Sequence, residues 1–137
     1  MCCDEWCVLQ PEAIDLYRAA RDGELDEVKA AVDAGAQMEW ANPDDYGTRA
    51  VHEASREGHK DVVAFLGSRG ADVNAVDNRQ MTPLHRAAFN GEASVCTALL
   101  ALGVDPAMKN KWGKTALDDA RRKNETECVA VLEAAMR

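Results

Sequence analysis

Histidine and cysteine are the side chains best able to perform catalysis or hold a metal, and this chain of 137 residues has three histidines and five cysteines. His52 and His85 lie 33 residues apart, and no cysteine or carboxylate accompanies them at the spacing of a metal-ligand set. Cys96 and Cys128 lie on apolar stripes, which predicts small core residues rather than ligands. The sequence also has no glycine-rich phosphate loop, His-Glu-x-x-His helix, Cys-x-x-Cys pair or Ser/His/Asp ordering. We therefore expect neither an enzyme nor a cofactor or metal site.

The composition is typical of one soluble globular domain. Hydrophobic residues make up 47% of the chain and charged residues 29%. The longest apolar run, around residues 98–102, is far shorter than the roughly 20 residues of a membrane helix. The formal net charge of −8 argues against binding to nucleic acid or to an anionic membrane surface. The odd number of cysteines and the lack of a signal peptide indicate reduced thiols, so we expect a monomer inside the cell, in the cytoplasm or the nucleus.

The two histidines belong to a wider internal repetition with a period of 33 residues. The same step relates Gly58 to Gly91 and Leu66 to Leu99. Toward the N-terminus the step grows to 35 residues, because the polar stretch 42–45 accommodates two extra residues. The repetition predicts an N-terminal extension, 1–10, and then four units: 11–43, 44–76, 77–109 and 110–137.

Each unit is predicted to form two helices followed by a projecting turn. Thr82 and Pro83 suit the N-cap and first turn of a first helix, and Gly91 suits its left-handed end, which Asn124 replaces in the last unit. The second helix carries an apolar stripe with the spacing of a buried face: Val95, Cys96, Ala98, Leu99 and Leu102. Unit two lacks the Thr-Pro pair and has Gly67 inside its second helix. These departures predict a weaker helix start and a cost near ~1 kcal/mol relative to alanine.

The segments TPLHRAAFNGE, VCTALLALGVDP and VHEASREGHKDVVAFLGSRGADVNAVDN resemble ankyrin repeats. The resemblance covers about residues 11–137. It implies an all-α solenoid of four helix-turn-helix units, with projecting β-hairpin-like loops and with terminal repeats that act as caps. It also implies that His52 and His85 form hydrogen bonds in the turns between units. Members of the family bind other proteins through a concave groove and have no catalytic centre, so the implied function is protein–protein interaction, as a scaffold, adaptor or stoichiometric regulator.

Transferring the groove positions of the family onto this sequence gives thirteen candidate residues for binding a protein partner. They are Tyr46, Thr48, Arg56, Glu57, Arg79, Met81, Phe89, Asn90, Lys111, Trp112, Lys114, Arg122 and Lys123. Aromatic residues flanked by charges are typical of binding hot spots. The alternative is that the rings pack on neighbouring hairpins. This alternative applies most to Trp112, because hairpins of the family often carry an aromatic residue there, whereas an outward Phe89 has less structural reason to be aromatic.

Charge is divided unequally along the chain. Residues 1–76 hold 16 acidic and 7 basic residues, whereas residues 77–137 hold 8 acidic and 9 basic residues. One interpretation is a solvated surface that keeps the stack soluble. The other is a groove that runs from acidic to basic and attracts a partner with the reverse gradient, mainly through the association rate.

Two further features suggest covalent modification. Cys2 and Cys3 could be palmitoylated, which would make the protein a membrane-tethered adaptor, although Asp4 and Glu5 oppose an anionic surface. The other interpretation of the extension is that its apolar residues cover the exposed face of the first repeat. Asn74 resembles the hairpin asparagine that asparaginyl hydroxylases modify in ankyrin repeats, and the alternative is that it serves the turn itself.

Overall fold

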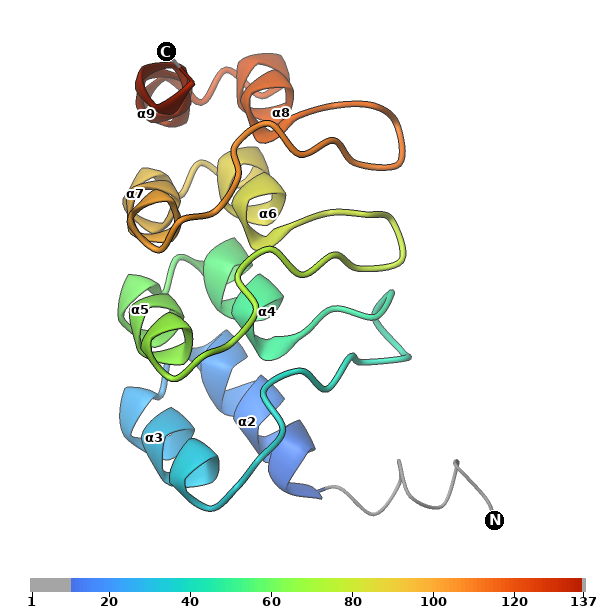
Figure 1. The fold of residues 1–137 in the computed structure, drawn as a ribbon, viewed down its shortest axis with the longest axis vertical. Helices are drawn as coiled ribbons and strands as arrows, with labels where there is room; N and C mark the ends of the chain where they lie inside the picture. The colour runs from blue at the N-terminus through green and yellow to red at the C-terminus, as the bar shows by residue number, and fades with distance from the viewer. Residues whose placement is uncertain (1–10, 137) are drawn as a thin grey trace.

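The computed structural model describes residues 11–136, and in this range the chain forms eight α-helices and no β-strand. The helices are α2 (Pro11–Asp22), α3 (Leu25–Asp33), α4 (Ala50–Glu57), α5 (Lys60–Ser68), α6 (Pro83–Phe89), α7 (Ala93–Ala101), α8 (Ala116–Arg122) and α9 (Thr126–Ala135). They pair as α2–α3, α4–α5, α6–α7 and α8–α9, and the pairs stack in chain order (Figure 1). The predicted all-α solenoid of helix-turn-helix units is confirmed.

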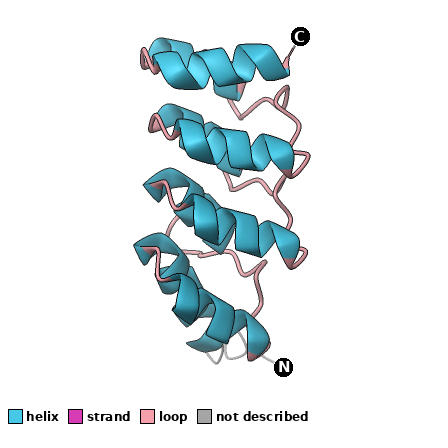
Figure 2. Cartoon of the chain, turned by 90° about the vertical axis from the view of Figure 1, so that its left-hand side faces the viewer, coloured by secondary structure: helices cyan, strands magenta, loops and turns pink. Residues whose placement is uncertain are grey.

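The stack has two helical layers and a row of projecting turns. The first helices of the pairs, α2, α4, α6 and α8, are called the inner helices, and the second helices, α3, α5, α7 and α9, are called the outer helices. Each helix packs on the next helix of its own layer as well as on its partner, and Figure 2 shows the outer layer from its exposed side. The turns that precede α4, α6 and α8 project away from the outer helices (Figure 1).

These turns, residues 42–48, 77–81 and 110–114, are called the fingers. In each finger the backbone N–H of the first residue donates to the carbonyl of the last, at 2.8, 3.1 and 2.9 Å respectively. In the second and third fingers the first side chain, Asp77 or Asn110, accepts two more backbone N–H groups through Oδ1. This local bonding explains why a short polar turn keeps a fixed, hairpin-like shape.

Side-chain caps and left-handed residues set the ends of the inner helices. Thr82 and Thr115 each accept a backbone N–H three residues onward, as their N-cap positions predict. Asn124 has φ +59°, so it does adopt the left-handed conformation that glycine provides in the other units. At α4 the N-cap residue Arg49 offers no side-chain cap, and the backbone N–H of Arg49 instead donates to His52 Nδ1 at 3.0 Å.

One continuous core runs through the stack between the two layers. Its largest fully buried apolar residues are Leu16, Leu66, Leu84, Leu99 and Leu132. Five alanines on the inner helices have a relative exposure of 0%, which lets these helices approach closely: Ala20, Ala54, Ala87, Ala88 and Ala120.

Gly67 on α5 lies against the next unit, which the sequence-based expectation of a helix cost did not consider. A Cβ atom at Gly67 would lie 2.6 Å from Cδ1 of Leu102, which follows α7. The glycine therefore makes room for a side chain of the next unit. Glycine destabilises the helix by its low propensity, but its lack of a side chain allows the outer helices to pack closely.

Candidate functional site

Three side chains of the inner helices fix the position of the next finger. His52 Nδ1 accepts the N–H of Arg49, so Nε2 carries the proton and donates to the Met81 carbonyl at 3.0 Å. His85 makes the corresponding bond to the Lys114 carbonyl, also at 3.0 Å. The predicted structural role of both histidines is confirmed. Both rings are buried, and burial lowers the pKa of His52 to about 4.

Tyr17 on α2 does the same for the first finger, and the sequence reasoning missed it. Tyr17 stands 35 residues before His52. In the first unit it therefore occupies the position that a histidine holds in the second and third units. Its hydroxyl donates to Asp45 Oδ2 at 3.0 Å and shares a hydrogen bond of 2.7 Å with the Thr48 hydroxyl. Burial raises the pKa of Tyr17 to about 12. The lengthened repeat step was the signal that could have identified this residue.

Thr48 is consequently not a surface residue, and its prediction as a partner-binding residue is wrong. Its relative exposure is 0%, because the hydroxyl points to Tyr17 and to Asp45 Oδ2. Transfer by position could not show that the residue beneath it is a tyrosine that fills the space under the finger.

The fingers are also joined to one another along their length. The N–H of Asn78 donates to the Tyr46 carbonyl at 2.8 Å, and the N–H of Lys111 donates to the Arg79 carbonyl at 3.0 Å. With the bonds from the inner helices below, each finger is held from two directions. The fingers and the inner helices together form one face, which we call the concave face, and its side chains therefore project from a fixed frame.

A pocket of about 630 Å³ lies between the last two fingers and the inner helices α6 and α8. Seven of the thirteen predicted residues line it: Arg79, Met81, Phe89, Asn90, Trp112, Lys114 and Arg122. The remaining lining residues were not predicted: Arg86, Asn110, Asp118, Asp119 and Arg121. We call this set the C-terminal pocket.

The other predicted residues lie beside this pocket. Lys111 and Lys123 flank its aromatic rings, while Tyr46, Arg56 and Glu57 belong to the preceding unit. Tyr46 is 56% exposed, and the guanidinium of Arg79 lies 4.2 Å from its ring centroid. Arg56 pairs with Glu57 at 3.1 Å. These three residues continue the concave face toward α4.

The two aromatic residues of the pocket differ in exposure. Trp112 is 60% exposed, with Lys111 Nζ 5.8 Å from its ring centroid, so the interpretation that it packs on a neighbouring finger does not hold for most of its surface. Phe89 is half-buried beneath Arg122 and Lys123, whose charged groups lie 5.5 and 4.9 Å from its centroid. Each ring thus offers an apolar surface with a cation beside it.

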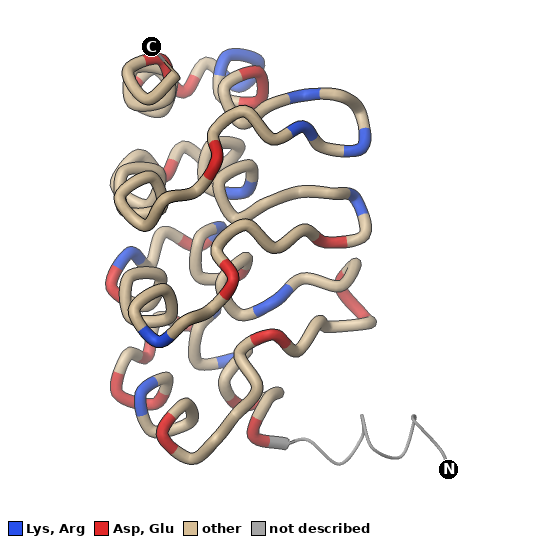
Figure 3. The backbone as a smooth tube through the Cα atoms, in the orientation of Figure 1, with Lys and Arg blue, Asp and Glu red and all other residues tan. Residues whose placement is uncertain are grey.

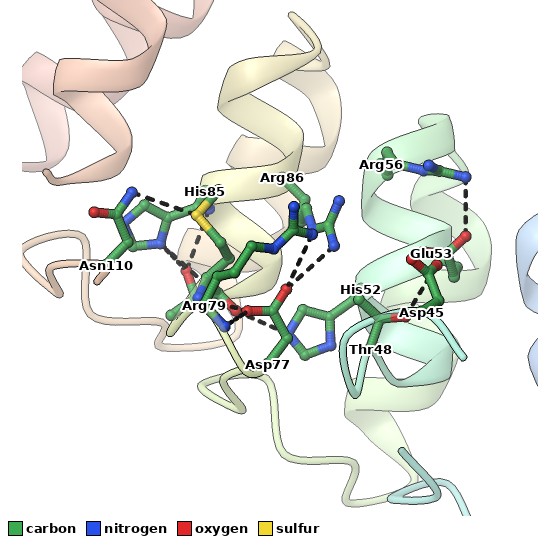
Figure 4. Close-up of polar contacts among 12 residues, drawn as sticks. Asp45, Thr48, His52, Glu53, Arg56, Asp77, Arg79, His85, Arg86 and Asn110 are labelled. Atoms are coloured by element: carbon green, nitrogen blue, oxygen red, sulfur yellow. Dashed lines mark hydrogen bonds and ion pairs between the residues drawn. The ribbon is translucent and has the colours of Figure 1, made fainter. Parts of the chain in front are cut away.

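At one equivalent position of the inner helices α4, α6 and α8, the charge of the side chain alternates from helix to helix. Glu53, Arg86 and Asp119 follow one another at 33-residue steps, and their relative exposures classify Glu53 and Asp119 as buried, at 1% and 3%. Arg86 pairs with Asp77 Oδ2 at 3.1 Å, and Arg79 approaches the same oxygen at 3.7 Å (Figure 4). This charged row was also missed, because its helix position is not among the groove positions transferred from the family.

The two buried carboxylates of this row are incompletely paired. Glu53 Oε1 accepts from Arg56 at 3.0 Å, and Asp119 Oδ1 lies 3.8 Å from Arg122. The second oxygen of each, Glu53 Oε2 and Asp119 Oδ2, is buried without a hydrogen-bond partner among the described residues. Burial is the main cause that raises the pKa of both groups.

The remaining sequence predictions concern modification and metal binding. Cys96 and Cys128 are buried free thiols, as predicted. Asn74 Oδ1 accepts the N–H of Asp105 at 3.1 Å, so the side chain joins two successive turns, and its hydroxylation stays a prediction. Cys2 and Cys3 lie outside the described residues, so acylation also stays a prediction.

Metal binding and membrane spanning are two further classes of function on which residues 11–136 bear. No group of three or more His, Cys, Asp or Glu side chains in this range could hold a metal ion. None of the helices formed there is long and apolar enough to cross a membrane.

A family model described as "Ankyrin repeats (many copies)" matches residues 16–67 and 51–100 of this chain. Among similar proteins, the "RelA-associated inhibitor" of Mus musculus is 35% identical over 85% of this chain and 14% of its own length. The "Inhibitor of Bruton tyrosine kinase" of Homo sapiens is 28% identical over 93% of this chain and 10% of its own length. A "Putative ankyrin repeat-containing protein" of Treponema pallidum is 38% identical over 70% of this chain and 32% of its own length.

The family match confirms the resemblance drawn from the repeats, and ankyrin repeats are protein-interaction modules of a generally non-enzymatic kind. The chain spans a third or less of the length of each of these relatives. The matched region is thus only a part of each of those proteins. Only the properties of the repeats themselves carry over.

Proposed function

We propose that this chain, which belongs to the ankyrin-repeat family, binds a partner protein through the concave face of its fingers and inner helices. The C-terminal pocket is the observation that carries the proposal. It combines an exposed tryptophan, a half-buried phenylalanine and several cations on a frame held by hydrogen bonds from two directions. Aromatic residues and arginine on a rigid concave surface are the composition of interaction hot spots.

Among scaffold, adaptor and stoichiometric regulator, we favour the regulator. Two of the similar proteins are named as inhibitors, one associated with RelA and one of Bruton tyrosine kinase. Those names describe the relatives, each of which is several times longer than this chain. They support the idea that a stack of this kind blocks a partner by occupying its surface, and no catalytic step is required for that.

A comparison of two phenylalanines tests the proposal. Phe89 lies on the concave face beneath two cations, and Phe65 lies on α5 in the outer layer with Lys29 and Arg69 at 5.9 and 5.6 Å. We expect Phe89→Ala, with or without Trp112→Ala, to lower retention of partner proteins from native lysate at least about tenfold. Phe65→Ala is the matched control and should retain them.

Thermal unfolding of each variant accompanies the binding measurement. Trp112→Ala should leave the thermal midpoint nearly unchanged because the ring is mostly exposed, and Phe89→Ala should lower it by only a few degrees. If Phe65→Ala abolished retention and Phe89→Ala did not, the partner would bind the outer layer and the proposal would fail.

The cellular setting forms a second part of the proposal. We place the chain in a reducing compartment, the cytoplasm or the nucleus, and the two free buried thiols Cys96 and Cys128 are consistent with this setting. The alternative is a membrane-tethered adaptor acylated at Cys2 and Cys3. Mass spectrometry of protein purified from its native source decides between them, because unmodified thiols at both positions would eliminate the tether.

A further inference from the structure

The C-terminal pocket is basic in a chain that is acidic overall. Five cationic side chains and two carboxylates line it, although the formal net charge of the chain is −8. Lys111 and Lys123 add further positive charge beside its two rings. Figure 3 shows several basic residues on the last finger and others beside acidic ones on α8, whereas the lower part of the stack carries many acidic residues among fewer basic ones.

The cations of the pocket are not all neutralised within the chain. Arg86 is held by Asp77, and Arg121 pairs with Glu133 at 2.7 Å. Lys114 is exposed and forms no ion pair with any residue in 11–136, and Arg122 is 68% exposed with its nearest carboxylate at 3.8 Å. At least these two cations are available to a ligand.

Three of the six buried side-chain N or O atoms that lack a hydrogen-bond partner among the described residues belong to residues of this pocket. They are the Nε atoms of Arg79 and Arg86 and Oδ2 of Asp119. The side chain of Arg86 is only 12% exposed (its head group is visible in Figure 4), so its charge is less accessible than the charges of Lys114 and Arg122. The pocket therefore lies against charged side chains whose hydrogen bonding within the described residues is incomplete.

From these observations we infer that the C-terminal pocket binds an acidic peptide segment of the partner protein. An aspartate or glutamate of the segment lies between Lys114 and Arg122 and is attracted by Arg86 beneath. An adjacent apolar side chain packs between Phe89 and Trp112. The inference rests on the proposed function and adds the chemistry of the partner to it.

The arrangement of charge favours a peptide over a nucleic acid. A nucleic acid carries a negative charge at every nucleotide. Asp118 and Asp119 in the pocket and Glu57 in the preceding unit would repel it. A peptide can place one or two carboxylates on the cations and leave apolar or basic groups elsewhere. The apolar surface between Phe89 and Trp112 also requires a side chain that phosphates do not provide.

Selection of peptides from a random display library against the full chain tests the inference without knowledge of the partner. Enriched peptides should carry Asp or Glu next to Leu, Phe or Trp, with more acidic than basic residues. Their affinity should fall about tenfold or more in the Lys114→Gln/Arg122→Gln variant and with rising ionic strength. Lys29→Gln/Lys60→Gln, which removes the same charge from the outer helices, is the matched control and should bind as the wild type does.

A charge-reversed variant and a nucleic-acid probe sharpen the outcome. Lys114→Glu/Arg122→Glu should lose the selected peptides and bind versions in which Lys replaces their acidic residues. If Phe89→Ala and Trp112→Ala weakened the selected peptides but the charge variants did not, the concave face would remain the binding site and the acidic segment would be wrong. If a single-stranded oligonucleotide bound more tightly than any selected peptide, and lost that affinity in Lys114→Gln/Arg122→Gln, the pocket would be a nucleic-acid site and the inference would be overturned.

Discussion

At each junction of the stack, a side chain of one inner helix bonds the finger of the next unit. The first junction uses a different chemical group from the two that follow. Between α2 and the first finger the link is the phenol of Tyr17, which bonds the side chains of Asp45 and Thr48. At the next two junctions it is an imidazole, from His52 or His85, which bonds a backbone carbonyl. The position along the inner helix is the same, so the fold requires a polar group of sufficient reach at this place rather than a particular residue.

The difference between the junctions lies in what else the side chain does. Each histidine also accepts a backbone N–H at the start of its own helix through Nδ1, whereas the phenol of Tyr17 does not. The histidine joints therefore couple the start of a helix to the next finger, and they depend on the protonation state of one ring. The tyrosine joint has no such dependence near neutral pH, since the pKa of Tyr17 is about 12.

Truncating the histidine joints should have the largest effect on stability. His52→Ala removes two hydrogen bonds and leaves a cavity at a fully buried site, so we expect the free energy of unfolding to fall by about 2–4 kcal/mol. His85→Ala should cost less, because Thr82 still caps α6, whereas Arg49 provides no side-chain cap for α4. Urea denaturation measures both. Equal losses for the two variants would show that the cap of α6 contributes nothing beyond its histidine.

Acid should weaken the second junction and leave the first intact. The pKa of His52 is about 4 in the folded chain and near 6.5 when unfolded, so the unfolded state takes up a proton first. The contribution of this group is present above pH 6.5 and is lost as the pH falls toward 4, with a full size of about 3 kcal/mol. Hydrogen exchange at pH 4.5 should therefore show faster opening at the α4–α6 junction than in α2.

Glu53 and Asp119 have the opposite effect on stability as the pH falls toward 4. Burial raises the pKa of both carboxyl groups, so their protonation on acidification favours the folded state. The difference between the wild type and His52→Gln isolates the histidine contribution. An unchanged slope of stability against pH in His52→Gln would mean that His52 is not the titrating group.

How far the sequence alone could lead depends on whether the relevant information is local. His85, Thr82 and Asn124 were predicted well, because each acts on its own turn and recurs at a fixed step. Thr48 was misplaced because its environment is set by Tyr17, which is 31 residues away. Repetition identifies equivalent positions, but it does not reveal what fills the space beneath them.

The same limit applies to the candidate site. Trp112 and Phe89 could be assigned to the concave face from their places in the repeat, and both line the C-terminal pocket. The pairing of Arg86 with Asp77 could not be predicted, since no motif contains it and it depends on how a finger approaches a helix. The binding role of all these residues remains a prediction that the experiments above address.

Gly67 lies at the contact between the two halves of the stack. After the histidine variants, we expect Gly67→Ala to have the next largest effect on the free energy of unfolding. Helix propensity alone predicts that Gly67→Ala gains about 1 kcal/mol. The 2.6 Å approach to Leu102 predicts the reverse, a loss of about 1–3 kcal/mol, because the leucine must move. A double-mutant cycle with Leu102→Ala measures this interaction, and the alanine at position 67 should become favourable once the leucine is absent. A gain in the single variant would show that Leu102 relaxes freely.

Tyr17→Phe should have the smallest effect of the series, although the residue is buried. The phenyl ring can keep its edge-to-face contact with Trp40, whose centroid lies 5.7 Å from that of Tyr17, and only the hydroxyl is lost. The Thr48 hydroxyl would still donate to Asp45 Oδ2 at 3.3 Å, so neither group is left wholly unpaired. We expect a loss of about 1 kcal/mol in urea denaturation, the same at pH 5 and pH 8. A loss as large as that of His52→Ala would mean that the Tyr17 hydroxyl alone holds the first finger. The expected small loss would show that the first junction depends mainly on packing, whereas the later junctions depend on hydrogen bonds.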